Sequence, residues 1–191
     1  MNQADIEKDL RKRLSAKRMR HTVGVQYTSC CLAMRWEEDI CKASLAGLLH
    51  DCAKQLSGEQ LLEECRKHTL PVNESQQNSP YLLHGQVGAY FAQHRYGVED
   101  PDILRAIEYH TTGRPGMSLL EKIVFTADYI EPQRDQAPDL PMLRKTAFTD
   151  LDKAVLMILR QTLDYLQQTG ARIDPMTEET WHYYSLKRHG E

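Results

Sequence analysis

The chain has 191 residues, of which 41% are hydrophobic, so it is long enough to bury one substantial core. Its formal net charge of −3 argues against general nucleic-acid binding, and no apolar run approaches the ~20 residues that span a bilayer. The five cysteines form no Cys-x-x-Cys pair and the N-terminus carries no signal peptide, so we expect a cytoplasmic protein with reduced thiols and no membrane partner.

Hydrophobic residues recur with helical spacing along the chain, and no stretch shows the period-two alternation of a strand. We therefore predict an all-α helical bundle formed by a single domain over residues 1–191, with its core at about 17–185. The polar, proline-containing segment 69–80 predicts a loop or lid. Helices are expected at about 2–14, 19–35, 44–54, 57–68, 83–94, 101–110, 118–128, 149–170 and from 174 onward.

The segment 44–54 has the pattern of a buried helix, because Leu45, Leu48 and Cys52 fall on one face. His50 and Asp51 stand side by side at its end. Burying unpaired polar groups there would cost roughly 2–7 kcal/mol each. Neutral histidine and ionised aspartate are both metal ligands, so a bound cation would remove that cost.

Four more candidate ligands recur along the chain: His21, His84, His110 and Asp128. Each lies in the apolar stripe of a different predicted helix, about one helix and one connection from the next. Any one of them alone reads as an ordinary core or surface residue. Together with the His-Asp pair they predict a metal site in the interior of a helical bundle.

Cationic side chains crowd the segment just before and around His21. Such a charge run is usually a solvated helix face. The functional alternative is attraction of a polyanionic substrate towards His21. The residues are Arg11, Lys12, Arg13, Lys17, Arg18 and Arg20.

Four blocks of sequence occur in order: Arg18-x-x-His21-Thr22-x-Gly24-Val25, Ala46-Gly47-Leu48-Leu49-His50-Asp51-x-Ala53-Lys54, Tyr109-His110-Thr111-Thr112-Gly113 and Ala127-Asp128-Tyr129-Ile130-Glu131-Pro132-x-Arg134. The order of ligands resembles the HD-domain superfamily of metal-dependent phosphohydrolases. The blocks themselves resemble the YqeK family of symmetrical bis(5'-nucleosyl)-tetraphosphatases. The resemblance runs from about residue 17 to 185.

This resemblance implies that diadenosine tetraphosphate is cleaved at its central phosphoanhydride to two ADP by a metal-activated water. The metal ligands would be His21, His50, Asp51 and Asp128, with iron expected and manganese or cobalt as alternatives. Asp51, His84 and His110 are predicted to be catalytic. Three roles stay open for the two histidines: holding a second metal bridged by Asp51, binding phosphate, or protonating the leaving group.

A polyphosphate substrate also requires fixed positive charge, and the sequence has no Gly-rich phosphate loop. Lys54 follows His50 by one helical turn and should face the same centre. For the contacts outside the ligand set, ordinary surface charge or helix capping is the competing interpretation. The predicted substrate contacts are His21, Lys54, His84, His110, Thr111, Asp128, Arg134, Gly170, Ala171, Arg172, Ile173, Asp174 and Pro175.

Two other functions compete with this one. The first is a different HD-domain nucleotide phosphohydrolase, such as a nucleotidase or an alarmone hydrolase, and release of phosphate from monophosphates would identify a nucleotidase. The second is a non-catalytic nucleotide sensor, against which the six intact ligand positions argue. The sequence does not decide the native metal, the number of ions, the base preference or the oligomeric state, for which a homodimer is one option.

Overall fold

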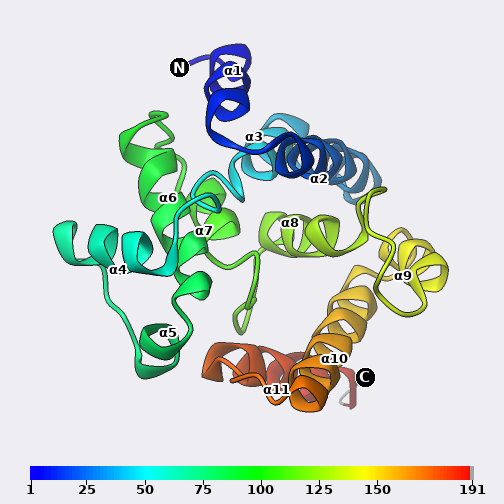
Figure 1. The fold of residues 1–191 in the computed structure, drawn as a ribbon. Coiled ribbons are helices and arrows are strands. Elements are labelled where there is room, and N and C mark those ends of the chain that lie inside the picture. Colours follow the sequence, from blue (N-terminus) through cyan, green and yellow to red (C-terminus); the bar gives the residue numbers. More distant parts are fainter. Residues whose placement is uncertain (190–191) are drawn as a thin grey trace.

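A computed structural model describes residues 1–189, and within that range the chain forms helices and turns with no β-strand (Figure 1). The all-α prediction is confirmed. The single domain predicted over 1–191 stays a prediction, and its last two residues lie outside the described range. The elements are α1 (Gln3–Arg13), α2 (Ala16–Trp36), α3 (Ile40–Leu49), α4 (Gly58–Lys67), α5 (Glu74–Asn78), the 3₁₀ helix η1 (Pro80–Leu83), α6 (His84–His94), α7 (Pro101–Glu108), α8 (Leu119–Ile130), α9 (Leu140–Ala147), α10 (Leu151–Thr169) and α11 (Pro175–His189).

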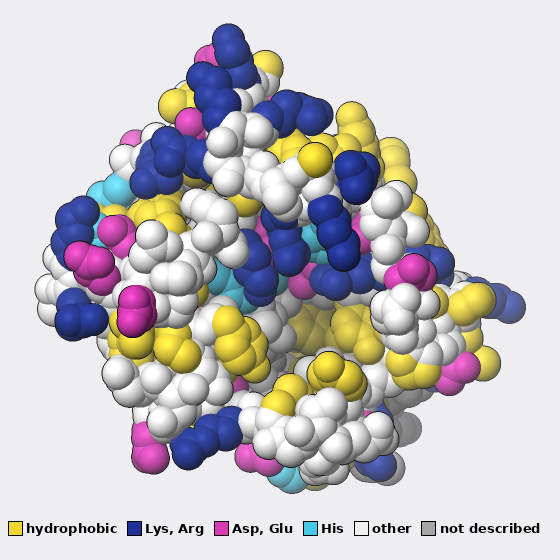
Figure 2. Space-filling model, in the orientation of Figure 1, with side chains coloured by type: hydrophobic (Ala, Val, Ile, Leu, Met, Phe, Trp, Pro, Cys, Tyr) yellow, Lys and Arg dark blue, Asp and Glu magenta, His cyan; other side chains and the backbone are white. Residues whose placement is uncertain are grey.

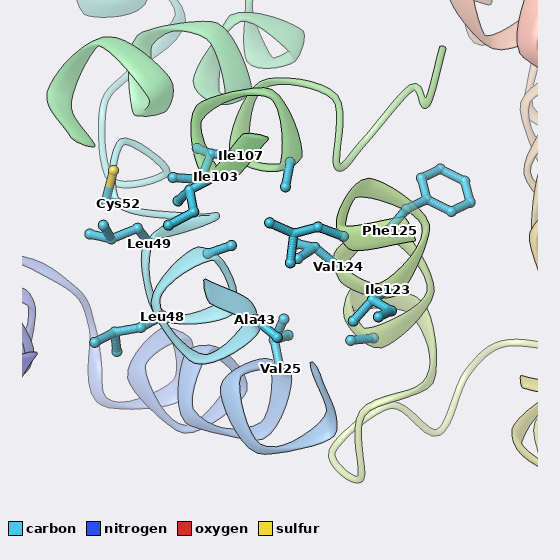
Figure 3. Close-up of a cluster of buried hydrophobic side chains, with 14 of the residues drawn as sticks. Val25, Ala43, Leu48, Leu49, Cys52, Ile103, Ile107, Ile123, Val124 and Phe125 are labelled. Carbon is cyan, nitrogen blue, oxygen red and sulfur yellow. The ribbon is translucent and has the colours of Figure 1, made fainter. Parts of the chain in front are cut away.

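The core lies between α2, α3, α7 and α8. Helix α2 packs against α3 and α8, and α7 packs against α3, α6 and α8. Figure 3 shows Val25, Leu49, Ile107 and Val124, one from each helix, meeting in this core, and all four are fully buried. Helices α9, α10 and α11 extend the bundle, with α10 packed against α8. Close packing of four helices fixes the relative positions of the side chains at their ends.

Several helices begin where side chains can bind the free amides of the first turn. Ser57 and Gln60 form the capping box that the sequence of α4 predicts, and Ser118 and Glu121 form another at the start of α8. Asp39 caps α3 by accepting from two backbone amides. The caps at Asp39 and Ser118 fix the start of α3 and of α8, two of the four helices that form the core.

The predicted helix over 44–54 is too long at its C-terminus. Helix α3 ends at Leu49, and residues 50–55 form turns that nevertheless bury His50 completely. Helix α7 likewise ends at Glu108, two residues before His110. A turn that is packed into the core has the same hydrophobic spacing as a helix, so the pattern alone could not show where these helices end.

The structure contains three short helical elements that the sequence did not predict. The expected loop 69–80 contains α5, whose capping box joins Asn73 and Gln76, followed by η1. Helix α9 begins beside Pro141, which obscures its pattern although proline is tolerated in a first turn. Among residues 1–189, the structure has no helix with the length and apolar character needed to cross a bilayer.

Candidate metal centre

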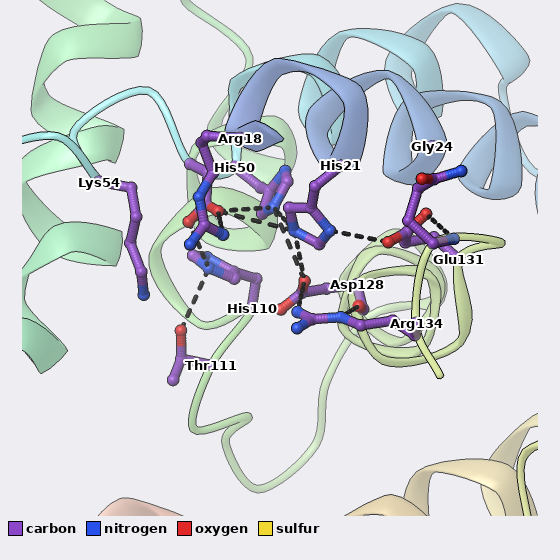
Figure 4. A network of polar contacts seen from close by, with 12 residues as sticks. Arg18, His21, Gly24, His50, Lys54, His110, Thr111, Asp128, Glu131 and Arg134 are labelled. Carbon is purple, nitrogen blue, oxygen red and sulfur yellow. Dashed lines mark hydrogen bonds and ion pairs between the residues drawn. The ribbon is translucent and has the colours of Figure 1, made fainter. Parts of the chain in front are cut away.

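The structure brings all six predicted ligands into one cluster at the end of the core. They come from α2, the turn after α3, the start of α6, the turn after α7, and α8. The four histidines and Asp51 are buried, whereas the Asp128 side chain is 21% exposed, so the cluster opens to the surface on that side. Figure 4 shows His21, His50 and Asp128 pointing toward one another.

Four ligand atoms converge at spacings that suit one cation. His21 Nε2 lies 3.0 Å from Asp128 Oδ1, 3.3 Å from His50 Nε2 and 3.7 Å from Asp51 Oδ2. His50 Nε2 lies 3.4 Å from Asp51 Oδ2 and 3.8 Å from Asp128 Oδ1. An ion with bonds of about 2.1 Å keeps neighbouring ligand atoms roughly 3.0–3.5 Å apart, so a small contraction would complete the site.

The second oxygen of Asp51 faces the other two histidines. Asp51 Oδ1 lies 3.4 Å from His84 Nε2 and 3.7 Å from His110 Nε2, and these two nitrogens are 3.1 Å apart. Asp51 therefore links the two halves of the cluster.

Each of the four histidines places its Nδ1 against a fixed acceptor. The pairs are His50 with the carbonyl of Gly47 (2.8 Å), His84 with that of Tyr81, His110 with that of Ile107 (2.7 Å), and His21 with Glu131 Oε1 (3.0 Å). Because these oxygens only accept, each Nδ1 must carry a hydrogen. In the neutral ring Nε2 is then a lone pair aimed into the cluster.

The convergence of these lone pairs indicates that a cation fits the cluster. His21 Nε2 and His50 Nε2 face each other at 3.3 Å, and between two acceptors that distance is repulsive unless a proton or a cation lies between them. The donor set of two imidazoles and two carboxylates fits a divalent transition metal. The cluster therefore has the geometry and the donor set of a divalent-metal site.

The electrostatics favour the ligand forms of the carboxylates. Burial opposes ionisation of Asp51, yet the neighbouring histidines, His50 above all, hold its pKa well below its usual range. Burial likewise acts on Asp128, but its contact with His21 and the charges of His50 and Arg134 hold its pKa well below normal. Burial and Lys54 lower the pKa of His84 to about 3, and burial and His50 lower that of His110 to about 4. Burial acts to lower the pKa of His50, but Asp51 outweighs it and raises that pKa.

Glu131 is a functional residue that the sequence analysis did not assign. It is 1% exposed; its Oε1 accepts from His21 and its Oε2 accepts from the backbone amide of Gln133 at 2.7 Å. Such a carboxylate behind a ligating histidine fixes the orientation of the ring and raises its basicity. Its position three residues after Asp128, at the end of α8, was the available signal.

Cationic side chains surround the mouth of the cluster. Arg18 donates to Asp51 Oδ2 at 2.7 Å, and Arg134 donates to Asp128 Oδ1 at 2.8 Å. Lys54 Nζ lies 3.0 Å from His84 Nε2, and Thr111 Oγ1 lies 3.1 Å from His110 Nε2. The structure therefore places Lys54, Thr111 and Arg134 beside the cluster, together with Arg18 from the basic segment, and their role as substrate contacts stays a prediction.

The predicted substrate loop 170–175 lies only partly beside the cluster. Gly170 takes the left-handed conformation that ends α10, and Ala171 and Arg172 are exposed. Asp174 is 3% exposed and lines a hollow of about 230 Å³ together with Thr111. Its Oδ1 accepts from the amide of Met176, while its buried Oδ2 has no hydrogen-bond partner among the described residues.

Comparison with known proteins agrees with this geometry. An HD-domain family model matches residues 18–133. The Bacillus subtilis symmetrical bis(5'-nucleosyl)-tetraphosphatase is 39% identical, over 96% of this chain and 97% of the relative. The protein of the same name from Halalkalibacterium halodurans is 38% identical, over 98% of this chain and 100% of the relative.

A crystal structure described as a predicted HD superfamily hydrolase involved in NAD metabolism, from Clostridium acetobutylicum, matches with a TM-score of 0.95. The two sequences are 41% identical, and the match covers 98% of each chain. Helix arrangement and sequence thus agree over nearly the whole length. This chain belongs to the HD-domain family and, within it, to the YqeK family of symmetrical bis(5'-nucleosyl)-tetraphosphatases.

Proposed function

We propose that this protein hydrolyses diadenosine tetraphosphate at its central phosphoanhydride and releases two ADP. The observation that carries the proposal is the convergence of His21 Nε2, His50 Nε2, Asp51 Oδ2 and Asp128 Oδ1, in a chain similar over nearly its whole length to enzymes with that name. A cluster of histidine and carboxylate ligands open on one side suits phosphoanhydride hydrolysis, because that reaction needs one free face of the site for the substrate.

His21, His50, Asp51 and Asp128 would hold the cation. Once bound, it supplies Lewis-acid polarisation of a phosphoryl oxygen and activation of water. Iron fits a mixed imidazole and carboxylate set, and manganese and cobalt are the alternatives. Glu131 holds His21 in the ligand orientation through its Nδ1.

His84 and His110 position the donors that bind phosphate. His84 Nε2 accepts from Lys54, which leaves the other hydrogens of the ammonium free to bind phosphoryl oxygens. Thr111 lies between the two histidines and the hollow beside Asp174. This assignment makes Lys54 the fixed charge that a polyphosphate requires on this side of the centre.

A second cation is an alternative for the same place. Asp51 Oδ1, His84 Nε2 and His110 Nε2 lie within 3.1–3.7 Å of one another, which is a three-ligand set bridged to the first by Asp51. The two assignments differ in stoichiometry, so metal analysis of the loaded protein distinguishes one ion per chain from two.

One nucleoside would lie in the hollow bordered by Thr111 and Asp174. The unpartnered Oδ2 of Asp174 supports this, because a buried carboxylate oxygen needs a donor and a ribose hydroxyl or an adenine amino group provides one. Gly170 and the following residues up to Pro175 would form the outer wall.

All five cysteines are free thiols, which fits our proposal of a cytoplasmic enzyme.

Product analysis tests this function. Protein loaded with iron, manganese or cobalt is incubated with diadenosine tetraphosphate, beside a His50→Ala, Asp51→Ala control. We expect ADP as the sole product from the wild-type protein and no turnover by the control. ATP with AMP would show asymmetric cleavage, and phosphate released from monophosphates would show a nucleotidase. Binding without turnover under every metal would show a nucleotide sensor.

A further inference from the structure

This inference rests on the proposed symmetrical hydrolysis. In that reaction the central phosphates of the substrate lie at the metal centre, and its two nucleoside diphosphate halves extend from the centre in different directions. One half is assigned above to the surface formed by Lys54, Thr111 and Asp174. Figure 4 shows Glu131 and Arg134 on the other side of the cluster from Lys54 and Thr111. The second half therefore needs a binding surface on the side of His21.

A basic hollow of about 380 Å³ opens on that side. Its lining includes His21 itself and the cations Lys17, Arg18, Arg20 and Arg134. The one carboxylate in its wall, Glu131, is buried, and both of its oxygens are already bonded. Figure 2 shows Lys and Arg side chains gathered in a band across the middle of this face, with histidine visible between them.

Two of these cations have no partner among the side chains that the structure describes. Arg18 and Arg134 are bound to the ligand carboxylates. Lys17 and Arg20 are exposed, and neither forms an ion pair or a side-chain hydrogen bond with any of the described side chains, which run from residue 1 to 187. Their donors are therefore available to an anionic ligand that extends outward from His21.

An apolar hollow of about 570 Å³ continues from the basic one. The two share Arg20, Glu131 and Gln133 in their walls. Met19, Val23 and Pro132 line the apolar hollow, and Met19 is only 4% exposed, so the wall is already formed. Arg11 also lines this hollow and donates a hydrogen bond to Glu7. The volume is within the roughly 300–1,000 Å³ typical of ligand pockets, and guanidinium groups stack on planar bases.

We propose that the continuous basic and apolar hollows bind the second nucleoside diphosphate half of the substrate. Lys17 and Arg20 bind its phosphates, and its base lies on Met19, Val23 and Pro132 beneath Arg11. The basic hollow lies next to the metal centre and the apolar hollow lies beyond it. This order matches the ligand, whose phosphates are nearest the metal and whose base is farther away. This second subsite distinguishes a dinucleotide from a mononucleotide, which occupies only the first.

The test compares binding of ADP with binding of the diadenosine tetraphosphate analogue whose central bridging oxygen is replaced by methylene. Titration calorimetry on metal-loaded protein is applied to the wild type, to Lys17→Ala/Arg20→Ala and to Arg11→Ala. Lys12→Ala is the matched control, because Lys12 is an exposed cation beside Arg11 that lines neither hollow.

We expect wild-type protein to bind the analogue more tightly than ADP. Lys17→Ala/Arg20→Ala should weaken analogue binding by on the order of tenfold or more, since each factor of ten is about 1.4 kcal/mol. Arg11→Ala should weaken it by a few-fold. ADP affinity should change less than twofold in every variant, and Lys12→Ala should match the wild type.

Analogue affinity unchanged in Lys17→Ala/Arg20→Ala, or an equal loss for ADP and analogue, would overturn the second subsite. Turnover of diadenosine tetraphosphate is measured on the same preparations. Wild-type protein that binds the analogue as described but releases no ADP would refute the proposed function and leave the subsite standing. If the wild-type protein releases ADP but Lys17→Ala/Arg20→Ala binds the analogue as tightly as the wild type, the proposed function stands and the second subsite is refuted.

Discussion

Gly24 on α2 lies directly against the carboxylate of Glu131, so closely that a Cβ at position 24 would overlap Oε2. The same carboxylate accepts from His21 Nδ1 through its other oxygen. Because Gly24 has no side chain, there is room beside it for the Glu131 carboxylate, which orients His21. A helix-interior glycine, normally unfavourable, has a specific function here.

Gly24→Ala should displace Glu131 and weaken metal binding. We expect the metal affinity to fall by about 10–100-fold, as is typical when the partner of a ligating histidine is disturbed. Overpacking should also lower the free energy of unfolding by about 1–3 kcal/mol. Metal titration and urea unfolding measure the two effects.

The control for this prediction is Gly88→Ala, because a Cβ at position 88 meets its nearest neighbour, Ile107 Cγ2, at 3.4 Å. That variant should keep its metal affinity. In the Glu131→Ala background the added methyl at position 24 has room, so Gly24→Ala should cause no further loss. Additive losses in the double variant would show that the two residues act independently.

Lys54→Met should weaken substrate binding and leave the metal in place. Its ammonium faces His84 rather than any of the four ligand atoms assigned to the cation, and its aliphatic stem is retained in methionine. We expect the KM for diadenosine tetraphosphate to rise by on the order of tenfold, as for a lost charge-assisted contact. Steady-state kinetics and metal content check this, with Lys67→Met, on the exposed end of α4, as the control. Loss of metal from Lys54→Met would contradict it.

Arg114→Met should destabilise the fold strongly. Glu121, 1% exposed, accepts from Arg114 Nε and Nη2 at 2.6 Å each and from the amide of Ser118. Removing the guanidinium leaves a buried carboxylate without its charge partner, which costs about 3–5 kcal/mol. Urea unfolding measures the loss. Arg114→Met/Glu121→Leu should recover most of it, because no buried charge is then left unpaired.

The stability contributed by Asp152 should depend on pH. Burial opposes ionisation of this carboxyl, but its contacts with Lys122 and Lys187 outweigh burial and lower its pKa. A carboxyl whose folded-state pKa lies below its unfolded value of about 3.9 stabilises the fold above that pH and loses the effect as pH falls. The Tm difference between wild type and Asp152→Asn should therefore be largest near neutral pH and shrink towards pH 3. A constant difference would assign the effect to packing.

Sequence alone located all six members of the cluster because each falls within a hydrophobic repeat, where a polar residue requires an explanation. It could not assign Glu131, whose partner His21 is 110 residues away. An acidic residue at a helix end has no local pattern that marks it as buried. The pairing exists only once α2 and α8 pack together.

The basic segment and the loop 170–175 show the same limit. Charge counting indicated attraction of an anion near His21, but which cations line a hollow follows from the path of the chain after α8. In the loop, the sequence singled out six adjacent residues, of which Asp174 lines the hollow beside Thr111. Helix α9 was missed since proline in its first turn reads as a break.

Three of the four imidazoles in the cluster take their orientation from their own turn of chain. His50, His84 and His110 each bond the carbonyl three residues earlier, so the chain that carries the ring also selects its tautomer. The tautomer of these three rings depends on a carbonyl of the same turn, whereas that of His21 depends on Glu131, the residue that follows the last turn of α8. Removing the Glu131 carboxylate would therefore leave three of the four imidazoles with their Nδ1 acceptors and deprive only His21 of its own.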